Sequence, residues 1–563
     1  MASAQQTAPP AANAPQAGEQ SQSTAAGKKK ADVHMTPEQT RQLFALVDQL
    51  IKFSSEETGL PIKSEVKRQI TSRAIVESYL KAKFAEDESA RRMQRGEIVL
   101  KKFGLLDRDF KLTPFLLDLL KEQIEAYYDF KTKTVYMLDW VDIEEQKPVL
   151  AHELTHALQD QHSDLTKWND QTPQDVSLKS SEDTDHLAKD EMDTAREAVV
   201  EGQATAVMID YVLKPMGKSL VKDPELVDAM KQQMSGSQDS PILARAPLLL
   251  SESLLFPYRE GLSFEQDVWM DQGQAAAFPG TLDRPPTSSW EIINPREYEK
   301  KHVPSIPLLP NIHPLVDSLY KPYDIGQIGQ LDVHILTEIF GGDEAAANLT
   351  PAWDGGLYWA GQRLSAKTTA DRHPTDKDPS VGTPVEQAGT NSIALFYLSV
   401  WRNEASARAF ARLYADELGR KYSGVKLDSD SGGGTQSSHS SAFKVFPPPA
   451  RSSEDSTESA GSDTALPPDE QVYSTNEGPV VITTRGKMVF VAESFPLELA
   501  RKLTAQILDA QGTGEIHLAQ AAQPGTPGLK TESMEPLTGG LVRFFSECGV
   551  MKAAVSAAMH AGK

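Results

Sequence analysis

The segment "LAHELTHALQDQH", from Leu150 to His162, holds three of the twelve histidines of this 563-residue chain. On an α-helix, side chains four residues apart lie on the same face, so His152 and His156 are expected to be neighbours on one stripe. Two imidazole nitrogens at this spacing can hold one Zn²⁺ ion, each at about 2.0–2.1 Å. The segment therefore predicts a helix that supplies two zinc ligands.

Glu153 follows the first of these histidines and completes an H-E-x-x-H pattern. In such a helix the glutamate acts as the general base that takes a proton from a zinc-activated water, rather than as a ligand. Glu153 shares a stripe with Leu150 and Leu154, and a charge buried among apolar side chains costs several kcal/mol unless it has a partner. A metal site supplies that partner, whereas the alternative is an ordinary exposed helix with two histidines.

The third ligand has two candidates in the sequence. His162 lies ten residues after His152, as in the metzincin pattern, but Gln159 stands where that pattern has a turn-forming glycine. A helix that continues through Gln159 puts His162 about 15 Å from His152 along its axis. We therefore expect His162 to cap or pack at the helix end, and keep its ligation as the less favoured alternative.

Glu201 is the favoured third ligand, in the segment "AREAVVEGQATAVM". Its helical face also carries small or apolar residues: Ala198, Ala204, Thr205 and Met208. Gly202 costs about 1 kcal/mol in a helix interior relative to Ala, and a close helix contact would explain its presence. We expect this helix to press against the histidine helix and bring Glu201 to the metal, the alternative being a surface glutamate.

Several other polar residues have more than one possible role. Glu197, one turn before Glu201, is a substitute ligand or an acceptor for a histidine N–H, and Asp160 is an acceptor candidate for His156. The candidates for stabilising an oxyanion are Tyr211, Tyr258, Arg259 and His186.

The H-E-L-T-H segment followed by "EGQA" at Glu201–Ala204 resembles the gluzincin group of zinc metallopeptidases. The resemblance implies His152, His156 and Glu201 as ligands of Zn²⁺, Glu153 as the base, and a peptide or protein substrate. No exopeptidase box of the G-x-M-E-N type is present, which favours an endopeptidase. The segments "AHELTHALQDQH", "EGQAT" and "RPPTSSWEIINPREY" also resemble those of poorly characterised bacterial zincin-like proteins.

The expected fold class is α+β and mostly helical, with a zincin-like metallopeptidase core, a helical N-terminal region and a small α+β C-terminal domain. The expected segments are a disordered low-complexity N-terminus (1–35), a helical region (36–126), the core (127–300), a connecting region and linker (301–384), the α+β domain (385–515) with a disordered insertion (425–470), and a C-terminal tail (516–563). The helical region is expected to support the core by packing, the alternative being a lid.

A β-hairpin is expected immediately before the histidine helix, in "YYDFKTKTVYML" at Tyr127–Leu138. Asp129–Lys133 has the composition of a turn, and the following residues alternate and are rich in aromatic and β-branched types. We expect the strand 135–138 to form a sheet edge to which a peptide substrate can add as an extra strand.

The composition restricts the partners and the location of the protein. Lys and Arg total 57 against 79 Asp and Glu, a net charge of -22, which argues against nucleic acid and anionic membranes as partners. No apolar run is long enough to predict a transmembrane segment. The start of the chain lacks an apolar signal region and is similar to a spacer after a removed signal, which favours a periplasmic or secreted protein. The oligomeric state stays open.

A second function class is compatible with the same sequence. The chain could be a non-catalytic envelope scaffold or binding protein whose metal is structural or absent. A structural zinc site is closed by four protein ligands, whereas a catalytic site keeps one position open. Only three strong ligand candidates are present in the sequence, which favours catalysis.

Overall fold

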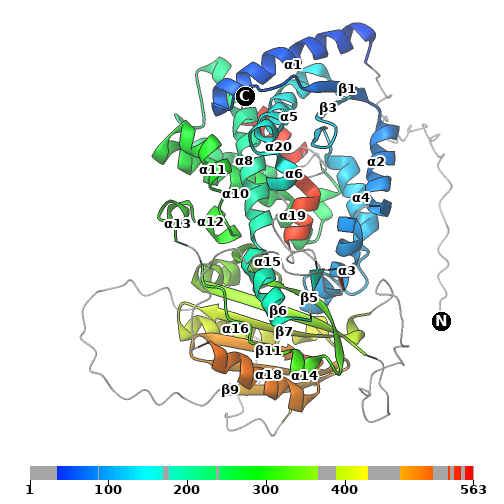
Figure 1. Ribbon diagram of the computed structural model, residues 1–563, viewed down its shortest axis with the longest axis vertical. Coiled ribbons are helices and arrows are strands. Elements are labelled where there is room, and N and C mark those ends of the chain that lie inside the picture. Colours follow the sequence, from blue (N-terminus) through cyan, green and yellow to red (C-terminus); the bar gives the residue numbers. More distant parts are fainter. Residues whose placement is uncertain are drawn as a thin grey trace, which may run out of the picture.

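The computed structural model describes residues 35–86, 88–168, 175–176, 178–235, 240–302, 304–364, 389–428, 469–511, 531–532, 538–546 and 552–561. Its described part is an α+β structure with 61% helix and 17% strand, which confirms the expected mostly helical class. Nearly all of the two segments expected to be disordered, 1–35 and 425–470, lies outside the described residues. The described residues form a helical body, which also holds a three-stranded and a two-stranded sheet, and a separate seven-stranded sheet (Figure 1).

The helical body begins with α1 (Pro37–Thr58), which crosses its top in Figure 1. Thr36 caps α1, since its hydroxyl accepts a hydrogen bond from the Gln39 amide at 3.2 Å. The apolar face of α1 packs on α5 (Ile143–Ser163), and the Ser54 hydroxyl donates to the Ala151 carbonyl at 3.0 Å. This close, buried contact agrees with packing support for the core.

The rest of the N-terminal region contains α2 (Arg73–Glu86), α3 (Glu88–Phe103) and α4 (Leu112–Gln123). The expectation of helices throughout 36–126 is wrong at β1 (Lys67–Thr71), which is a strand. β1 pairs in parallel with β3 (Thr134–Leu138). A partner strand that lies far away in the sequence decides the local conformation here, and a local pattern cannot reveal it.

The expected hairpin is confirmed: β2 (Ala126–Asp129) pairs antiparallel with β3. Its turn includes Lys133 in the left-handed region, at φ 54°. The strand order is β1-β3-β2, so β3 is the central strand and the expectation that 135–138 forms a sheet edge is wrong. The two edges of this sheet are β1 and β2.

Three long helices form the centre of the body: α5, α8 (Met192–Leu213) and α10 (Leu248–Gln272). The side chains of α8 are buried over most of its circumference, as expected for a helix inside a protein. Shorter helices surround them: α6 (Leu165–Trp168), α7 (Ser180–Lys189), α9 (Glu225–Ser235), α11 (Thr281–Asp283), α12 (Ser289–Ile293) and α13 (Pro295–Glu299). Short 3₁₀ segments lie at Lys214–Met216, Leu243–Arg245, Thr350–Ala352 and Thr390–Ser392.

The second part is an antiparallel sheet of seven strands. In spatial order they are β5 (Tyr320–Gln327), β6 (Trp353–Arg363), β7 (Ile393–Trp401), β11 (Met488–Glu493), β10 (Gly478–Arg485), β9 (Asp469–Thr475) and β8 (Lys426–Leu427). β5 and β6 fall within 301–384, so the expected start of the α+β domain at residue 385 is too late. A connecting region was expected there because its many prolines hide the strand pattern.

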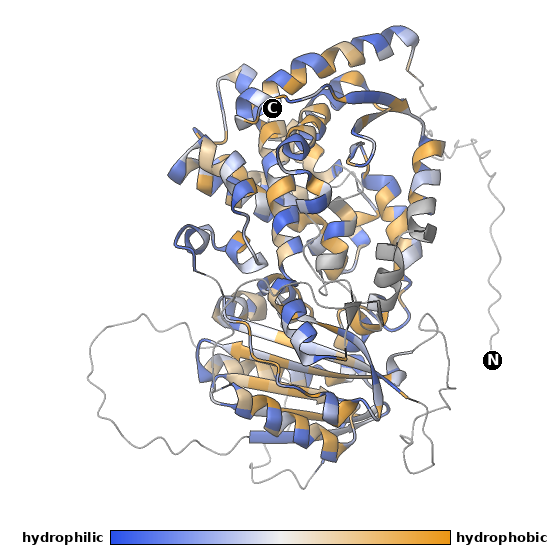
Figure 2. Cartoon of the chain, in the orientation of Figure 1, coloured by the Kyte–Doolittle hydropathy of each residue, from blue (hydrophilic) through white to orange (hydrophobic). Residues whose placement is uncertain are grey.

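Both faces of this sheet are covered, and its strands are strongly apolar (Figure 2). One face packs on α15 (Gln330–Leu349), α16 (Glu404–Asp416), α17 (Leu418–Lys421) and the helical body. The other face packs on α14 (His313–Val316) and α18 (Leu497–Ala510). Burial on two faces explains why the central strands read as continuous apolar runs rather than as alternating ones.

The C-terminal segment, expected to be a tail over 516–563, returns to the helical body. α19 (Gly539–Ser546) and α20 (Lys552–Ala561) pack against α8, α9 and α10, and Thr531–Glu532 (β12) pairs with Asp175–Val176 (β4). The amide of Ala553 donates to the Gln123 side-chain oxygen at 3.2 Å. None of the described helices is long and apolar enough to cross a membrane.

Candidate metal centre

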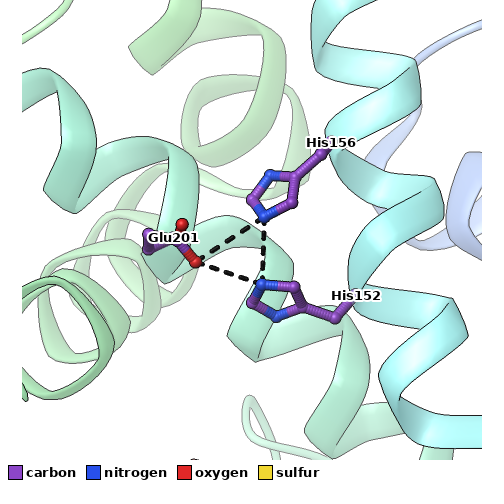
Figure 3. Close-up of side chains that lie close together, drawn as sticks. All are labelled: His152, His156 and Glu201. Atoms are coloured by element: carbon purple, nitrogen blue, oxygen red, sulfur yellow. Dashed lines mark hydrogen bonds and ion pairs between the residues drawn. The ribbon is translucent and has the colours of Figure 1, made fainter. Parts of the chain in front are cut away.

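α5 and α8 bring three candidate ligands together in the middle of the helical body (Figure 3). The Nε2 atoms of His152 and His156 are 3.0 Å apart. One carboxylate oxygen of Glu201, Oε2, lies 3.1 Å from Nε2 of His152 and 3.6 Å from Nε2 of His156. The two imidazoles project from successive turns of α5, and the carboxylate reaches them from α8.

The spacing of these atoms fits a zinc ion. Three ligands about 2.0–2.2 Å from one tetrahedral centre lie roughly 3.3–3.5 Å from one another. The observed separations of 3.0, 3.1 and 3.6 Å bracket that range. Two imidazoles and one carboxylate are also a donor set that zinc enzymes use, with a fourth position open.

All three side chains are buried, and their charges are strongly coupled. Burial lowers the pKa of His152 to about 4, although Glu201 opposes the shift. Burial also disfavours the charged form of His156, but the carboxylates of Glu201 and Glu153 outweigh it and raise the pKa of His156 to about 9. Burial disfavours ionised Glu201, yet the two histidines hold its pKa well below its ordinary range. Without metal, the cluster is a carboxylate beside one neutral and one charged imidazole.

Glu153, the expected base, is fully buried on the same helix as the two histidines. The negative charge of its carboxylate raises the pKa of His156 and that of Tyr258. Glu153 is therefore within electrostatic reach of the ligand cluster but is not one of its three converging residues.

Tyr258 is the one oxyanion candidate that lies beside the cluster. The ring centroids of Tyr258 and His152 are 6.2 Å apart, and the rings are inclined by 24°. Burial raises the pKa of Tyr258 well above its ordinary value, and the Glu201 carboxylate adds to this through its charge and a hydrogen bond. The phenol is thus a neutral donor to Glu201.

The other three oxyanion candidates lie in other contacts. Tyr211 is ten residues after Glu201 on α8, about 15 Å along the axis, and packs edge-on against Phe53. Arg259 pairs with Glu252 at 3.2 Å. His186 pairs with Asp190 at 3.3 Å.

His162 lies apart from the cluster, as expected from a helix that runs on past Gln159. Its Nε2 is 3.0 Å from Oδ1 of Asp283, at the end of α5. Glu197, the substitute ligand, is buried one turn before Glu201, and its charge acts on Tyr258. Neither residue belongs to the group of converging ligand atoms found in the described part of the chain.

The acceptor for His156 is Gln159 rather than Asp160. Nδ1 of His156 lies 2.9 Å from the amide oxygen of Gln159. Asp160 instead accepts from the Tyr128 hydroxyl at 3.0 Å and from Lys133 at 2.8 Å, which ties α5 to the β2–β3 hairpin. The i to i+3 spacing from His156 could have indicated Gln159.

Gly202 does mark a close helix contact, but the partner is α10 rather than the expected histidine helix. A Cβ atom on Gly202 would lie 2.3 Å from the backbone carbonyl of Gly261. The part of Gly261 in this contact was not predicted, because a single glycine in a helix does not reveal which helix faces it.

The comparisons with known proteins identify no relative, since no family model, no curated protein and no solved structure matches this chain.

Proposed function

We propose that this protein is a zinc-dependent metallopeptidase with a zincin-like core of the gluzincin type, cleaving within peptide or protein substrates. His152, His156 and Glu201 would hold the zinc, and Glu153 would act as the general base. The observation that carries the proposal is the convergence of two imidazole nitrogens and one carboxylate oxygen at 3.0–3.6 Å, with the Glu153 carboxylate in electrostatic reach. The H-E-x-x-H pattern and the "EGQA" segment support the same assignment.

A bound zinc ion would supply Lewis acidity, which lowers the pKa of a water to about 7 and polarises the carbonyl of the scissile bond. Glu153 would accept a proton from the attacking water and then deliver it to the leaving amine. His156 would give up the proton that its raised pKa favours, so that both histidines bind as neutral imidazoles through their Nε2 lone pairs. Tyr258 would hold the Glu201 carboxylate in place through its hydrogen bond.

The strand that a peptide would meet is β2, since β3 has partners on both sides. Among the described strands, β2 pairs with β3 alone. Tyr128 on β2 is hydrogen-bonded to α5 through Asp160, and the ring of Phe130 lies 6.4 Å from that of His156. A substrate strand added to β2 would therefore run next to the ligand cluster.

Burial of the site favours a second candidate, a scaffold with a structural metal. His152, Glu153, His156 and Glu201 are each no more than 4% exposed. A structural zinc site would, however, need a fourth protein ligand, and the ligand group found among the described residues has three members. For this reason we favour catalysis.

The direct test replaces Glu153 with Gln in the full chain, with Glu144→Gln on the exposed first turn of the same helix as the control. We expect Glu153→Gln to keep its zinc and to lose at least about 100-fold in the rate of cleavage of a peptide library, because a general base contributes about 10²–10⁴. The control should match the wild type in both respects. Near-normal proteolysis by Glu153→Gln would exclude the mechanism. A wild type that holds zinc and cleaves no peptide would support the scaffold.

A further inference from the structure

A chain of buried amide side chains leads away from the candidate metal centre. Gln159 on α5 contacts His156, Gln203 on α8 contacts Gln159, and both glutamines are fully buried. Gln203 in turn contacts the π-helical turn Ala276–Gly280 and Thr281, which follow α10. We propose that Gln159 and Gln203 form a positioning relay that fixes the tautomer and the ring orientation of His156 for metal binding. The inference rests on the proposed metal site but not on peptidase activity.

The orientation of the Gln203 amide follows from its surroundings. Three acceptors lie within hydrogen-bond distance of its Nε2: the carbonyls of Ala277 and Phe278 at 3.0 and 2.9 Å and the Thr281 hydroxyl at 2.8 Å. The two amide hydrogens are shared among them. A reversed amide would place an oxygen against two carbonyl oxygens, which have no proton to give. The Oε1 atom of Gln203 must therefore face Gln159.

The same reasoning fixes Gln159. Its Nε2 donates to Oε1 of Gln203 at 2.8 Å and to the carbonyl of Val200 at 3.0 Å. Both partners are acceptors, so Oε1 of Gln159 must face Nδ1 of His156, 2.9 Å away. An amide oxygen can only accept, and Nδ1 must then carry the proton.

A proton on Nδ1 leaves Nε2 of neutral His156 as a lone pair, directed at the point where His152 and Glu201 meet. Two backbone carbonyls thus fix the orientation of two amides, and the second amide fixes which imidazole nitrogen of His156 carries the proton. The relay also joins α5, α8 and the turn after α10, so it sets the position of the ring as well as its tautomer. Partners of this kind usually change metal affinity 10–100-fold when they are removed.

Gln159→Leu is the main test, because leucine fills similar space and cannot accept the Nδ1 proton. Gln203→Leu removes the second amide without touching His156. Gln161→Leu is the matched control, since Gln161 lies on the same helix but bonds to the backbone of Lys63 and Ser64 at its exposed end. The readouts are the zinc dissociation constant, from competition with a chelator, and the visible absorption spectrum of the Co²⁺-loaded protein, both on samples whose circular dichroism confirms folding.

We expect Gln159→Leu to weaken zinc binding 10–100-fold and to shift the Co²⁺ bands, Gln203→Leu to act in the same direction by less, and Gln161→Leu to match the wild type. The double variant should bind zinc about as weakly as Gln159→Leu, because the two residues act as one unit. If Gln159→Leu keeps wild-type zinc affinity and the wild-type spectrum, the relay is merely structural and the inference fails. Should Gln159→Leu not fold, the same result for Gln203→Leu overturns the inference. A wild type that binds no zinc overturns the metal site, and the relay with it.

Discussion

Gly202 of α8 and Gly261 of α10 meet backbone to backbone. A Cβ atom on Gly202 would lie 2.3 Å from the carbonyl of Gly261, and one on Gly261 would lie 2.1 Å from the carbonyl oxygen of Ala198. Neither helix has a side chain that can move aside at this crossing. Because Gly202 follows Glu201 directly, the contact also sets how far α8 presents that carboxylate toward the two histidines.

Gly202→Ala is therefore expected to destabilise the fold by about 1–3 kcal/mol or more, since overpacking forces backbone shifts. It should also weaken zinc binding through displacement of Glu201. Urea unfolding with and without zinc measures both effects. The control is Gly419→Ala, where an added Cβ meets no atom within 4 Å and the change should stay within about 0.5 kcal/mol. Equal stability of the two variants would contradict the close crossing.

Glu191 and Asp332 are buried carboxyl groups where the helical body meets the sheet. The Glu191 side chain accepts from the Ser289 amide at 2.9 Å, and Asp332 accepts from the Gly329 and Thr538 amides at 2.9 and 3.2 Å. Burial raises the pKa of Glu191 to about 7, with nearby Asp190 adding to the shift. Burial and the charge of Glu191 raise the pKa of Asp332 to about 8.

These shifts make stability depend on pH with a defined sign. In the unfolded chain both groups lose their protons near pH 4, whereas the folded chain keeps them up to about pH 7–8. Between these limits the unfolded state binds fewer protons, so the free energy of unfolding falls as pH rises. Glu191→Gln removes one of the two groups. The free energy of unfolding of Glu191→Gln, measured relative to wild type, should therefore be on the order of 2 kcal/mol higher at pH 8 than at pH 5.

Urea unfolding at the two pH values measures this difference, with Glu56→Gln on the exposed side of α1 as the control. The stability difference between Glu56→Gln and wild type should be the same at both pH values. A stability difference between Glu191→Gln and wild type that stays constant from pH 5 to pH 8 would contradict the account.

The C-terminal helices are expected to be part of the folded body. Val542 on α19 is fully buried in the main apolar cluster, whereas Leu178 is 58% exposed. Val542→Asp should cost several kcal/mol, because it places a charge in an apolar site, and Leu178→Asp should leave stability nearly unchanged. Thermal unfolding compares the two. Equal melting temperatures would mean that α19 does not contribute to the core.

Patterns local in the sequence predicted the elements that depend on local chemistry. The hairpin Tyr127–Leu138, the start of α1 and the mostly helical class were readable from alternation, capping residues and helical periodicity. The strand Lys67–Thr71 was missed because its partner, β3, is more than sixty residues away. For the same reason the central position of β3 in its sheet was not predicted. The sheet strands within 301–384 and the return of the C-terminus also depend on distant partners.

In the candidate site, too, the features that follow from local sequence were predicted and those that depend on distant partners were not. The spacing of His152 and His156 follows from helix geometry alone, and small residues around Glu201 indicated a close approach of its helix. The partner in that approach, Gly261, and the amides of Gln159 and Gln203 were missed. Glutamine side chains give no periodic signal, and their role depends on which oxygens surround them after folding.

The most direct test of the central claim is zinc content by elemental analysis, on wild type beside Glu201→Ala and His162→Ala. The account predicts one zinc ion per chain in wild type and in His162→Ala, whose ring bonds to Asp283 instead, and loss of zinc in Glu201→Ala. Retention of zinc by Glu201→Ala together with loss by His162→Ala, or a wild type that cannot be loaded with zinc at all, would contradict it.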